Sequence, residues 1–205
     1  MAGFVKDTPP ASARSGRAAL LLIKPGANMG ALTCVKPSRE ALSTLALIAM
    51  TGEAMYKRIL VPIDGSDTAA RGLAEAIALA RELKATVRLL NLTSDFVLMV
   101  EMSNVIDYEK FREGLNQVGR RLLAQASELA KAQGVTAETS LHDLRGGRVA
   151  DAIVEEARQS RCDLIVIGTH GRRGVARAML GSDAENVVRS SPVPVLLVRA
   201  PAPVS

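Results

Sequence analysis

Hydrophobic and polar positions follow two alternating patterns from residue 57 onward. Five apolar runs of strand length occupy residues 57–63, 86–92, 135–141, 163–167 and 195–198. Between these runs, apolar positions recur every three to four residues, as in amphipathic helices, at residues 68–84, 104–133, 148–159 and 184–190. Strands that alternate with helices predict crossover connections. We therefore expect an α/β fold: a three-layer, open, Rossmann-like sheet of five mostly parallel strands with helices on both faces.

Two loops of such a sheet are the places to look for a ligand. In open α/β sheets, ligands bind beyond the carboxyl ends of the strands, where the strand order reverses. The first loop follows Ile63 and begins with Asp64-Gly65-Ser66-Asp67, a turn and N-cap cluster. Because Ser66 and Asp67 can cap the next helix, Asp64 is left to serve a ligand. A carboxylate repels phosphate, so its expected role is to accept a hydrogen bond from a sugar hydroxyl.

The second loop is rich in glycine and follows Ile167. It contains Gly168, Gly171 and Gly181, and Ser182 comes directly after the last of these. Glycine lets the backbone approach a ligand without a Cβ in the way, and N–H groups at a helix start bind phosphate. The loop lacks the Gly-Lys-Ser/Thr of a Walker motif and the Gly-x-Gly of the dinucleotide fingerprint. These residues alone predict either a phosphate cradle or tight turns, and Ser182 is either a phosphate ligand or an N-cap.

The spacing Gly168-x2-Gly171-x9-Gly181-Ser182 resembles the nucleotide-binding pattern of the universal stress protein family, Gly-x2-Gly-x9-Gly-Ser/Thr. Residues 59–66 (Ile-Leu-Val-Pro-Ile-Asp-Gly-Ser) are similar to the family's opening strand and acidic turn. The segments 163–171 and 191–199 are similar to its fourth and fifth strands. The resemblance covers residues 55–200. It departs at Asn91-Leu92, where the family often has His-Val.

The resemblance implies a sheet in the order 3-2-1-4-5, an ATP site, and homodimers that pair through the last strand, residues 195–198. The ligand-binding residues that it implies by position are Pro62, Ile63, Asp64, Leu92, Ile167, Gly168, His170, Gly171, Gly181 and Ser182. The glycines and the serine are expected around the triphosphate, Asp64 near the ribose, and the aliphatic residues near the adenine. Mg²⁺ can accompany ATP, because phosphates recruit it.

Composition narrows the remaining possibilities. Aromatic residues make up only 2% of the 205 residues, which argues against single-strand nucleic-acid binding by base stacking. The net charge is +5, but the first 54 residues hold six of the 26 Lys and Arg and only three of the 21 acids. Most of the excess therefore lies in that segment, and the totals do not support a basic nucleic-acid-binding face. A bound adenine would have to lie against aliphatic side chains.

Metal and nucleophile chemistry have few candidate residues. The chain has two Cys, Cys34 and Cys162, and two His, His142 and His170, which is too few for a disulfide framework or a four-ligand zinc site. We expect Cys162 to be a buried small apolar residue. His142 is expected in a surface loop with no role, and His170 as a main-chain contact residue. No catalytic or metal-binding residue is assigned.

Residues 1–54 are predicted to be a poorly ordered N-terminal extension that contains a short helix near residues 39–50. A start-site artefact is the alternative, with translation beginning at Met55. Their apolar runs are shorter than a membrane span or a secretory signal requires. We expect residues 55–200 to form the domain, residues 201–205 to be a tail, and the protein to be cytoplasmic, without membrane or nucleic-acid partners.

The expected function is an ATP-binding stress-response or signalling module whose nucleotide state controls unidentified protein partners, with little or no turnover. One alternative is a slow ATPase or nucleotidyl transferase that uses the same pocket. Adenylating α/β enzymes carry a Ser-Gly-Gly-x-Asp-Ser type of loop after the first strand, which Asp64-Gly65-Ser66-Asp67 does not supply. The other alternative is a nucleotide-free dimeric scaffold. Residues 93–103 are expected to cover either the nucleotide or a partner surface.

Overall fold

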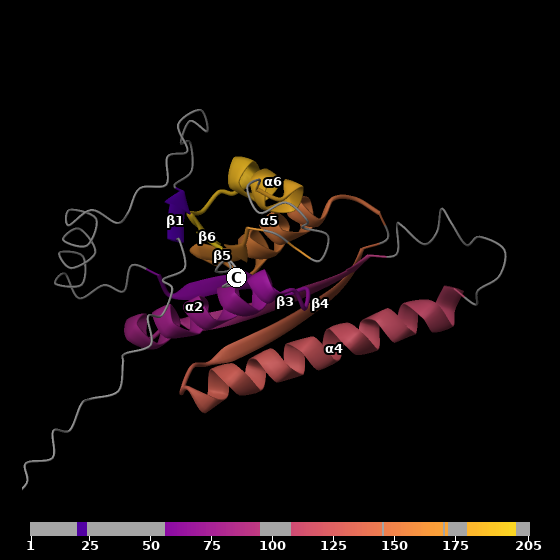
Figure 1. Cartoon of the computed structure of the whole chain (residues 1–205), viewed down its shortest axis with the longest axis horizontal. Helices are drawn as coiled ribbons and strands as arrows, with labels where there is room; N and C mark the ends of the chain where they lie inside the picture. Colours follow the sequence, from indigo (N-terminus) through magenta and orange to yellow (C-terminus); the bar gives the residue numbers. More distant parts are fainter. Residues whose placement is uncertain are drawn as a thin grey trace, which may run out of the picture.

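A single six-stranded sheet organises the protein in a computed structural model, which describes residues 20–23, 56–94, 108–144, 146–169, 171 and 180–199 (Figure 1). The strands are β1 (Leu20–Ile23), β2 (Arg58–Pro62), β3 (Thr86–Ser94), β4 (Ala137–Leu144), β5 (Leu164–Gly168) and β6 (Val195–Val198). The helices are α2 (Asp67–Leu83), α4 (Tyr108–Ala132), α5 (Val149–Gln159) and α6 (Ser182–Ser190).

The strand order is β1-β6-β5-β2-β3-β4. Strands β2 to β6 are all parallel to one another, and β2 lies between β3 and β5. Counted from β2, these five strands have the order 3-2-1-4-5, so the predicted fold is confirmed. The strand order reverses between β2 and β5, because the chain first continues to β3 and β4 and only then crosses back.

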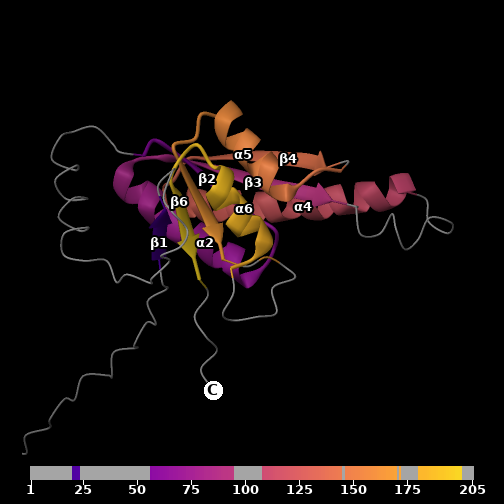
Figure 2. The same ribbon diagram turned by 90° about the horizontal axis from the view of Figure 1, so that it is seen from above.

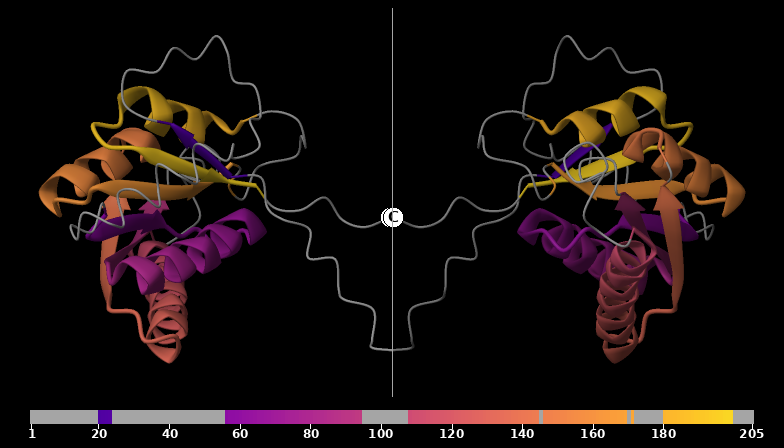
Figure 3. Two further views of the ribbon diagram at one scale, coloured as in Figure 1. Left: turned by 90° about the vertical axis from the view of Figure 1, so that its left-hand side faces the viewer. Right: turned by 90° about the vertical axis from the view of Figure 1, so that its right-hand side faces the viewer.

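Helices cover both faces of the sheet, with α2 and α4 on one side and α5 and α6 on the other (Figure 3). Helix α4 runs along β3 and β4 (Figure 2). Local sequence sets the ends of α2: the Ser66 hydroxyl accepts a hydrogen bond from the Ala69 N–H, and Lys84 adopts the left-handed conformation of a C-cap. None of the helices that the structure describes is long and apolar enough to cross a bilayer.

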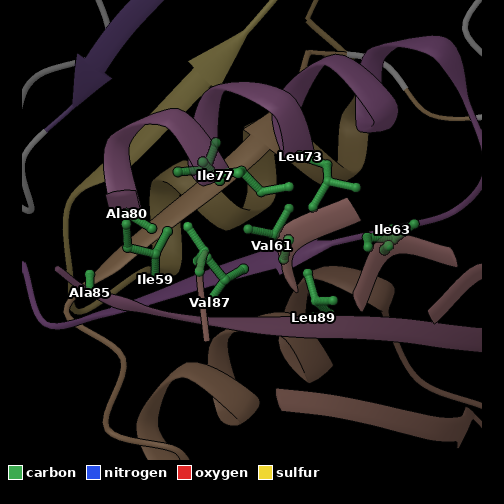
Figure 4. Packing of buried hydrophobic residues seen from close by; sticks show 14 of the residues in the cluster. Ile59, Val61, Ile63, Leu73, Ile77, Ala80, Ala85, Val87 and Leu89 are labelled. Carbon is green, nitrogen blue, oxygen red and sulfur yellow. The ribbon is translucent and has the colours of Figure 1, made fainter. Parts of the chain in front are cut away.

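Two apolar clusters lie on the two faces of the sheet. Under α2, the side chains of Ile59 and Val61 from β2 meet Ile77 from α2 (Figure 4). Leu60, the residue between those two strand residues, packs with the opposite cluster beside α5 and α6. This alternation follows from the two-residue period of a strand, and burial on both faces explains why β2 reads as a continuous apolar run.

Two strands extend beyond their predicted ends. We predicted His142 in a surface loop, but it lies within β4 and opposite Leu92 in the register. The pairing continues through Thr93↔Asp143 and Ser94↔Leu144. The loop assignment was therefore wrong, because ladder pairing with β3 extends β4 through residues that have no strand pattern of their own. Strand β4 is also an edge of the described sheet, where polar side chains are tolerated.

The N-terminal segment contributes an element that the sequence did not predict. Residues Leu20–Ile23, which we expected in a poorly ordered tail, form strand β1 and pair antiparallel with β6. The short helix suggested near residues 39–50 lies outside the described residues, as does the tail at 201–205.

Candidate functional site

The carboxyl ends of β2 and β5 are neighbours, because these two strands pair directly at Ile59↔Leu164 and Leu60↔Ile165. The loops that follow them bring Asp64 and Gly171 together. A Cβ added to Gly171 would lie 2.9 Å from Oδ2 of Asp64. We call this place, made up of Asp64, Gly168, Gly171, Gly181 and Ser182, the β2–β5 rim. Two of the predicted site segments, more than 100 residues apart in sequence, therefore meet here.

Asp64 is held in a fixed orientation by the turn that it begins. Its Oδ1 accepts hydrogen bonds from the Ser66 backbone N–H at 2.9 Å and from the Ser66 hydroxyl at 2.6 Å. Gly65, between them, has φ +83°, a conformation that favours glycine. We expected Asp64 to serve a ligand; in the structure one of its carboxylate oxygens also builds the turn, while Oδ2 is the atom next to Gly171.

Gly168 lies where β5 meets helix α2. A Cβ on it would come within 2.9 Å of the Thr68 Cβ and of the Thr68 carbonyl carbon. A Cβ on Gly72, one turn further along α2, would lie 3.6 Å from the Gly168 nitrogen. The first turns of α2 therefore approach the end of β5 too closely for a larger residue at 168. This packing accounts for Gly168 whether or not a phosphate binds beside it.

The start of helix α6 returns to the same end of β5. The Gly181 N–H donates to the Thr169 carbonyl at 2.8 Å, which ties the helix start to the residue that follows β5. Gly181 is the N-cap residue, and no side chain caps this helix by a hydrogen bond. Ser182 is thus the first helical residue and exposed, not the N-cap that we considered as its alternative role. A helix start without a side-chain cap leaves N–H groups that an anion can use.

The aliphatic residues predicted around the base divide between the two faces of the sheet. Leu92 and Ile167 pack in the cluster beside α5 and α6, and the strand alternation puts Pro62 on that face as well. Ile63 instead packs under α2 and α4 and is only 6% exposed. Pro62, Leu92 and Ile167 therefore share one side of the strand ends, whereas the Ile63 side chain belongs to the core.

One residue beside the rim was not assigned a role from the sequence. Asn91 is 1% exposed, and its Nδ2 donates to the Ile63 carbonyl at 2.6 Å, so it fixes the backbone just before Asp64. Its Oδ1 faces α4, where a Cβ on Gly119 would lie 2.4 Å away. The departure of Asn91 from the family's usual His was the one signal in the sequence. His170, Gly174 and the arginines at 172, 173 and 177 lie outside the described residues.

Comparison with known proteins identifies the family of this chain. The family model described as the universal stress protein family matches residues 55–199. The chain belongs to the universal stress protein family. Universal stress protein MJ0531 of Methanocaldococcus jannaschii is 35% identical over 75% of this chain and 88% of its own length. Universal stress protein YxiE of Bacillus subtilis is 34% identical over 71% of this chain and 100% of its own length.

Solved structures of the family have the same fold. Hypothetical protein MJ0577 superposes with a TM-score of 0.63 at 25% identity, over 72% of this chain and 99% of its own length. A family member from Burkholderia pseudomallei has a TM-score of 0.59 at 29% identity, over 72% of this chain and 99% of its own. A universal stress protein in complex with cAMP has a TM-score of 0.51 at 27% identity, over 70% and 97%. At least one structural neighbour therefore binds a nucleotide.

This universal stress protein also contains a charge cluster on the α5 side of β2, β3 and β4, formed by Arg58, Arg88, Glu138, His142 and Glu156. Glu156 is at its centre and only 3% exposed. Its Oε1 accepts from Arg88 Nε at 2.8 Å and from the Ser160 hydroxyl at 2.8 Å. The Nε2 atom of His142 lies 3.0 Å from Glu156 Oε2.

The hydrogen bonds and ion pair between Glu156 and Arg88 shift the pKa values of both residues. Burial alone would raise the pKa of Glu156, but hydrogen bonds from Arg88 and Ser160 outweigh it and hold that pKa below its ordinary value. Burial acts to lower the pKa of Arg88, and the partner carboxylates of Glu156 and Glu138 raise it above its ordinary value. Both residues therefore stay charged, and their charges are neutralised within the chain.

Cysteine and metal chemistry have no site among the described residues. Burial raises the pKa of the Cys162 thiol to about 11, so it stays protonated and packs as a small apolar residue, as predicted. Cys34 lies outside the described residues. In the part of the chain that the structure describes, no group of three or more His, Cys, Asp or Glu side chains is placed to hold a metal ion.

Proposed function

We propose that this universal stress protein binds ATP at the β2–β5 rim and acts as a nucleotide-dependent stress-response or signalling module with little or no turnover. One observation carries the proposal: a carboxylate in a fixed orientation and a glycine backbone meet at the point where the strand order reverses. The cAMP complex of a structural neighbour supports an adenine nucleotide as the ligand class. A cytoplasmic location belongs to the same proposal, since ATP is the ligand.

The ribose is assigned to Asp64. A carboxylate next to a triphosphate would be repelled, whereas sugar hydroxyls are donors that a carboxylate accepts well. The two hydrogen bonds from Ser66 hold Oδ1, so the orientation of the carboxylate is set before a ligand arrives. A carboxylate that already accepts two hydrogen bonds is suited to positioning a sugar rather than to removing a proton, which supports little turnover.

The phosphates are assigned to the glycine backbone and the start of α6. The Gly181 N-cap leaves the helix start without a side-chain cap, and the exposed Ser182 hydroxyl stands next to it. Aligned peptide dipoles favour negative charge at this end. Glu185 of the first turn is paired with Arg189 one turn further along, at 2.8 Å, which neutralises one of the two acids near this end. When bound, ATP can bring Mg²⁺ with it.

The adenine is assigned to the aliphatic surface formed by Pro62, Leu92 and Ile167. Pro62 and Leu92 are half-buried, so part of each residue remains open to a ligand, while Ile167 is buried. Aliphatic packing gives the base a hydrophobic surface but less selectivity than aromatic stacking would. We therefore expect the affinity to depend mainly on the ribose and phosphate contacts.

Titration of the full chain with ATP by isothermal calorimetry tests the proposal, with Gly171→Val as the deciding variant. A side chain at 171 would collide with Asp64 Oδ2, so we expect the affinity to fall at least tenfold. Gly114→Val is the matched control, since a Cβ there meets nothing within 4 Å. Equal ATP affinity in wild type and Gly171→Val would refute the assignment, and steady multiple-turnover release of ADP would refute the low turnover.

A further inference from the structure

The edge of the sheet formed by β6 is covered by the chain's own N-terminal segment. Strand β1 lies beside β6 in the ribbon views (Figures 1 and 3). The register runs from Leu20↔Val198 to Ile23↔Val195, so the four residues of β1 match the four residues of β6 from end to end. No residue of β6 is left without a neighbour in β1.

Pairing with β1 satisfies backbone groups that β6 would otherwise expose at the edge of the sheet. Without β1, the backbone N–H and C=O groups on the outer side of β6 would be unpaired at the sheet edge, and such an edge pairs with other chains. The strand itself is wholly aliphatic, Val-Leu-Leu-Val, and carries no charged residue that would discourage such pairing. The β6 edge is therefore built to accept a strand.

The orientation of β1 indicates which strand would otherwise pair with the β6 edge. When a twofold axis relates two copies of one edge strand, the two strands pair antiparallel. Strand β1 also pairs antiparallel with β6 and occupies the same row of backbone groups. A second copy's β6 and the chain's own β1 therefore cannot occupy this edge together.

We propose that the β6 edge is a self-association surface that β1 closes within the same chain, so that two copies pair through Val195–Val198 only after β1 leaves. The occupant that replaces β1 is the β6 of a second copy. The chain would then exchange between two states: a monomer in which β1 covers β6, and the homodimer expected from the family resemblance, in which β6 pairs with its copy. The proposal does not rest on nucleotide binding.

The length of the connecting segment allows this exchange. Residues 24–57 separate β1 from β2 and could span roughly 110 Å when fully extended. The distance to bridge across β6 and β5 is only three strand spacings, roughly 14 Å. The chain between the two strands is therefore several times longer than the distance that it has to bridge. A tether of this kind keeps β1 at an effective concentration of order 1 mM at β6, so closure competes well at micromolar protein.

A double variant of the full chain, Leu21→Pro with Leu22→Pro, tests the proposal. Neighbouring residues of a strand direct their N–H groups to opposite sides, so one of the two prolines must remove a donor that faces β6. Leu32→Pro with Thr33→Pro is the matched control, with two prolines in the same N-terminal segment but outside β1. The dissociation constant for self-association is measured by sedimentation equilibrium over a range of concentrations.

We expect the β1 variant to self-associate at least tenfold more tightly than wild type and the control. Equal dissociation constants in all three proteins would overturn the proposal. A wild-type dimer that becomes monomeric in the β1 variant would also overturn it, because β1 would then join two chains instead of closing one. Far-ultraviolet circular dichroism and unfolding by urea verify that the variant domain is folded.

Two further measurements test whether the self-association takes place at β6. In the dilute monomeric variant, those backbone amides of Val195–Val198 that face β1 should exchange hydrogen at least tenfold faster than in wild type, and should become protected again as the dimer forms, whereas those that face β5 should not change. A synthetic peptide of residues 17–26 should dissociate the variant dimer, whereas a scrambled peptide of the same composition should not. Failure of both would overturn the assignment to β6 even if the variant dimerises.

Discussion

The β2–β5 rim and the charge cluster both gather polar side chains on the same sheet, but they differ in how these are satisfied. In the charge cluster, Glu156 has Arg88, His142 and Ser160 as partners, all within 3.0 Å. At the rim, the structure brings together one carboxylate, several glycines and a helix start without a side-chain cap. The first arrangement neutralises its own charge, and the second leaves room and backbone donors for a ligand.

This difference separates a structural from a functional set of polar residues. A buried carboxylate with a depressed pKa, as in Glu156, is often taken as a sign of an active site. Here burial acts to raise the pKa, and the hydrogen bonds from Arg88 and Ser160 lower it by more; the Arg88 pair joins β3 to α5. At the rim, the Asp64 carboxylate accepts the two hydrogen bonds from Ser66 that shape its turn. Variants of the two regions should therefore affect different measurements.

The largest effect is expected from Glu156→Ala. It leaves the half-buried Arg88 with only the Glu138 carboxylate, and breaking a buried pair in this way costs about 3 kcal/mol of unfolding free energy. ATP affinity should change less than twofold. Urea unfolding and calorimetry measure the two quantities. Glu155→Ala, on the exposed side of the same helix, is the control and should cost less than about 0.5 kcal/mol. A large loss of ATP affinity in folded Glu156→Ala would contradict this prediction, because it would show that the charge cluster contributes to nucleotide binding.

The reverse pattern is expected from Ser182→Ala. Removal of a hydroxyl that bonds a charged phosphate should weaken ATP binding by about 2 kcal/mol. Unfolding free energy should hardly change, because the Ser182 side chain does not cap α6. Exposed Ser190→Ala at the other end of α6 provides the control, and its ATP affinity should equal that of wild type. An unchanged affinity in Ser182→Ala would remove this hydroxyl from the phosphate site.

A smaller loss is expected from Gly119→Ala, which tests the support of the rim from α4. The new Cβ would lie 2.4 Å from Asn91 Oδ1 and 2.7 Å from Leu141 Cδ1. Overpacking should exceed the gain in helix propensity, for a net destabilisation of about 1–2 kcal/mol. ATP affinity should fall too, because Asn91 holds the Ile63 carbonyl. Gly114→Ala in the same helix is open to solvent and should stabilise by about 0.5–1 kcal/mol. Stabilisation by both changes would contradict the close contact at 119.

The smallest effect concerns pH. The pKa of Glu156 is lower in the folded protein than in the unfolded chain, so its stabilising contribution is fully present above the unfolded-state value. It is lost as the pH falls through the folded-state value. Between pH 6 and pH 3.5, wild type should therefore lose more unfolding free energy than Glu156→Gln. Parallel urea titrations at both pH values measure this, and an equal loss in the two proteins would show that Glu156 is not the group responsible.

Much of the fold and the main positions of the candidate site could be predicted from the sequence. The β6 bounds agree with the prediction at both ends, and α2 differs by a single residue at each end. The two loops at the strand ends were identified because turn residues and glycines follow buried strands. The boundary of β4 was missed, because its last three residues are strand only through their pairing with β3. The ligand roles of the rim residues remain predictions.

The sequence by itself determined the features that depend on near neighbours: the alternation of strands and helices, the Ser66 cap and the glycine spacing of the rim. The tertiary structure alone decided which distant groups meet. The backbone N–H groups of Lys57 and Arg58 donate to the Asp163 carboxylate, Glu156 is buried against Arg88, and β1 covers β6. Local patterns arise from periods of two and 3.6 residues along the chain, whereas these contacts depend on how the sheet is ordered.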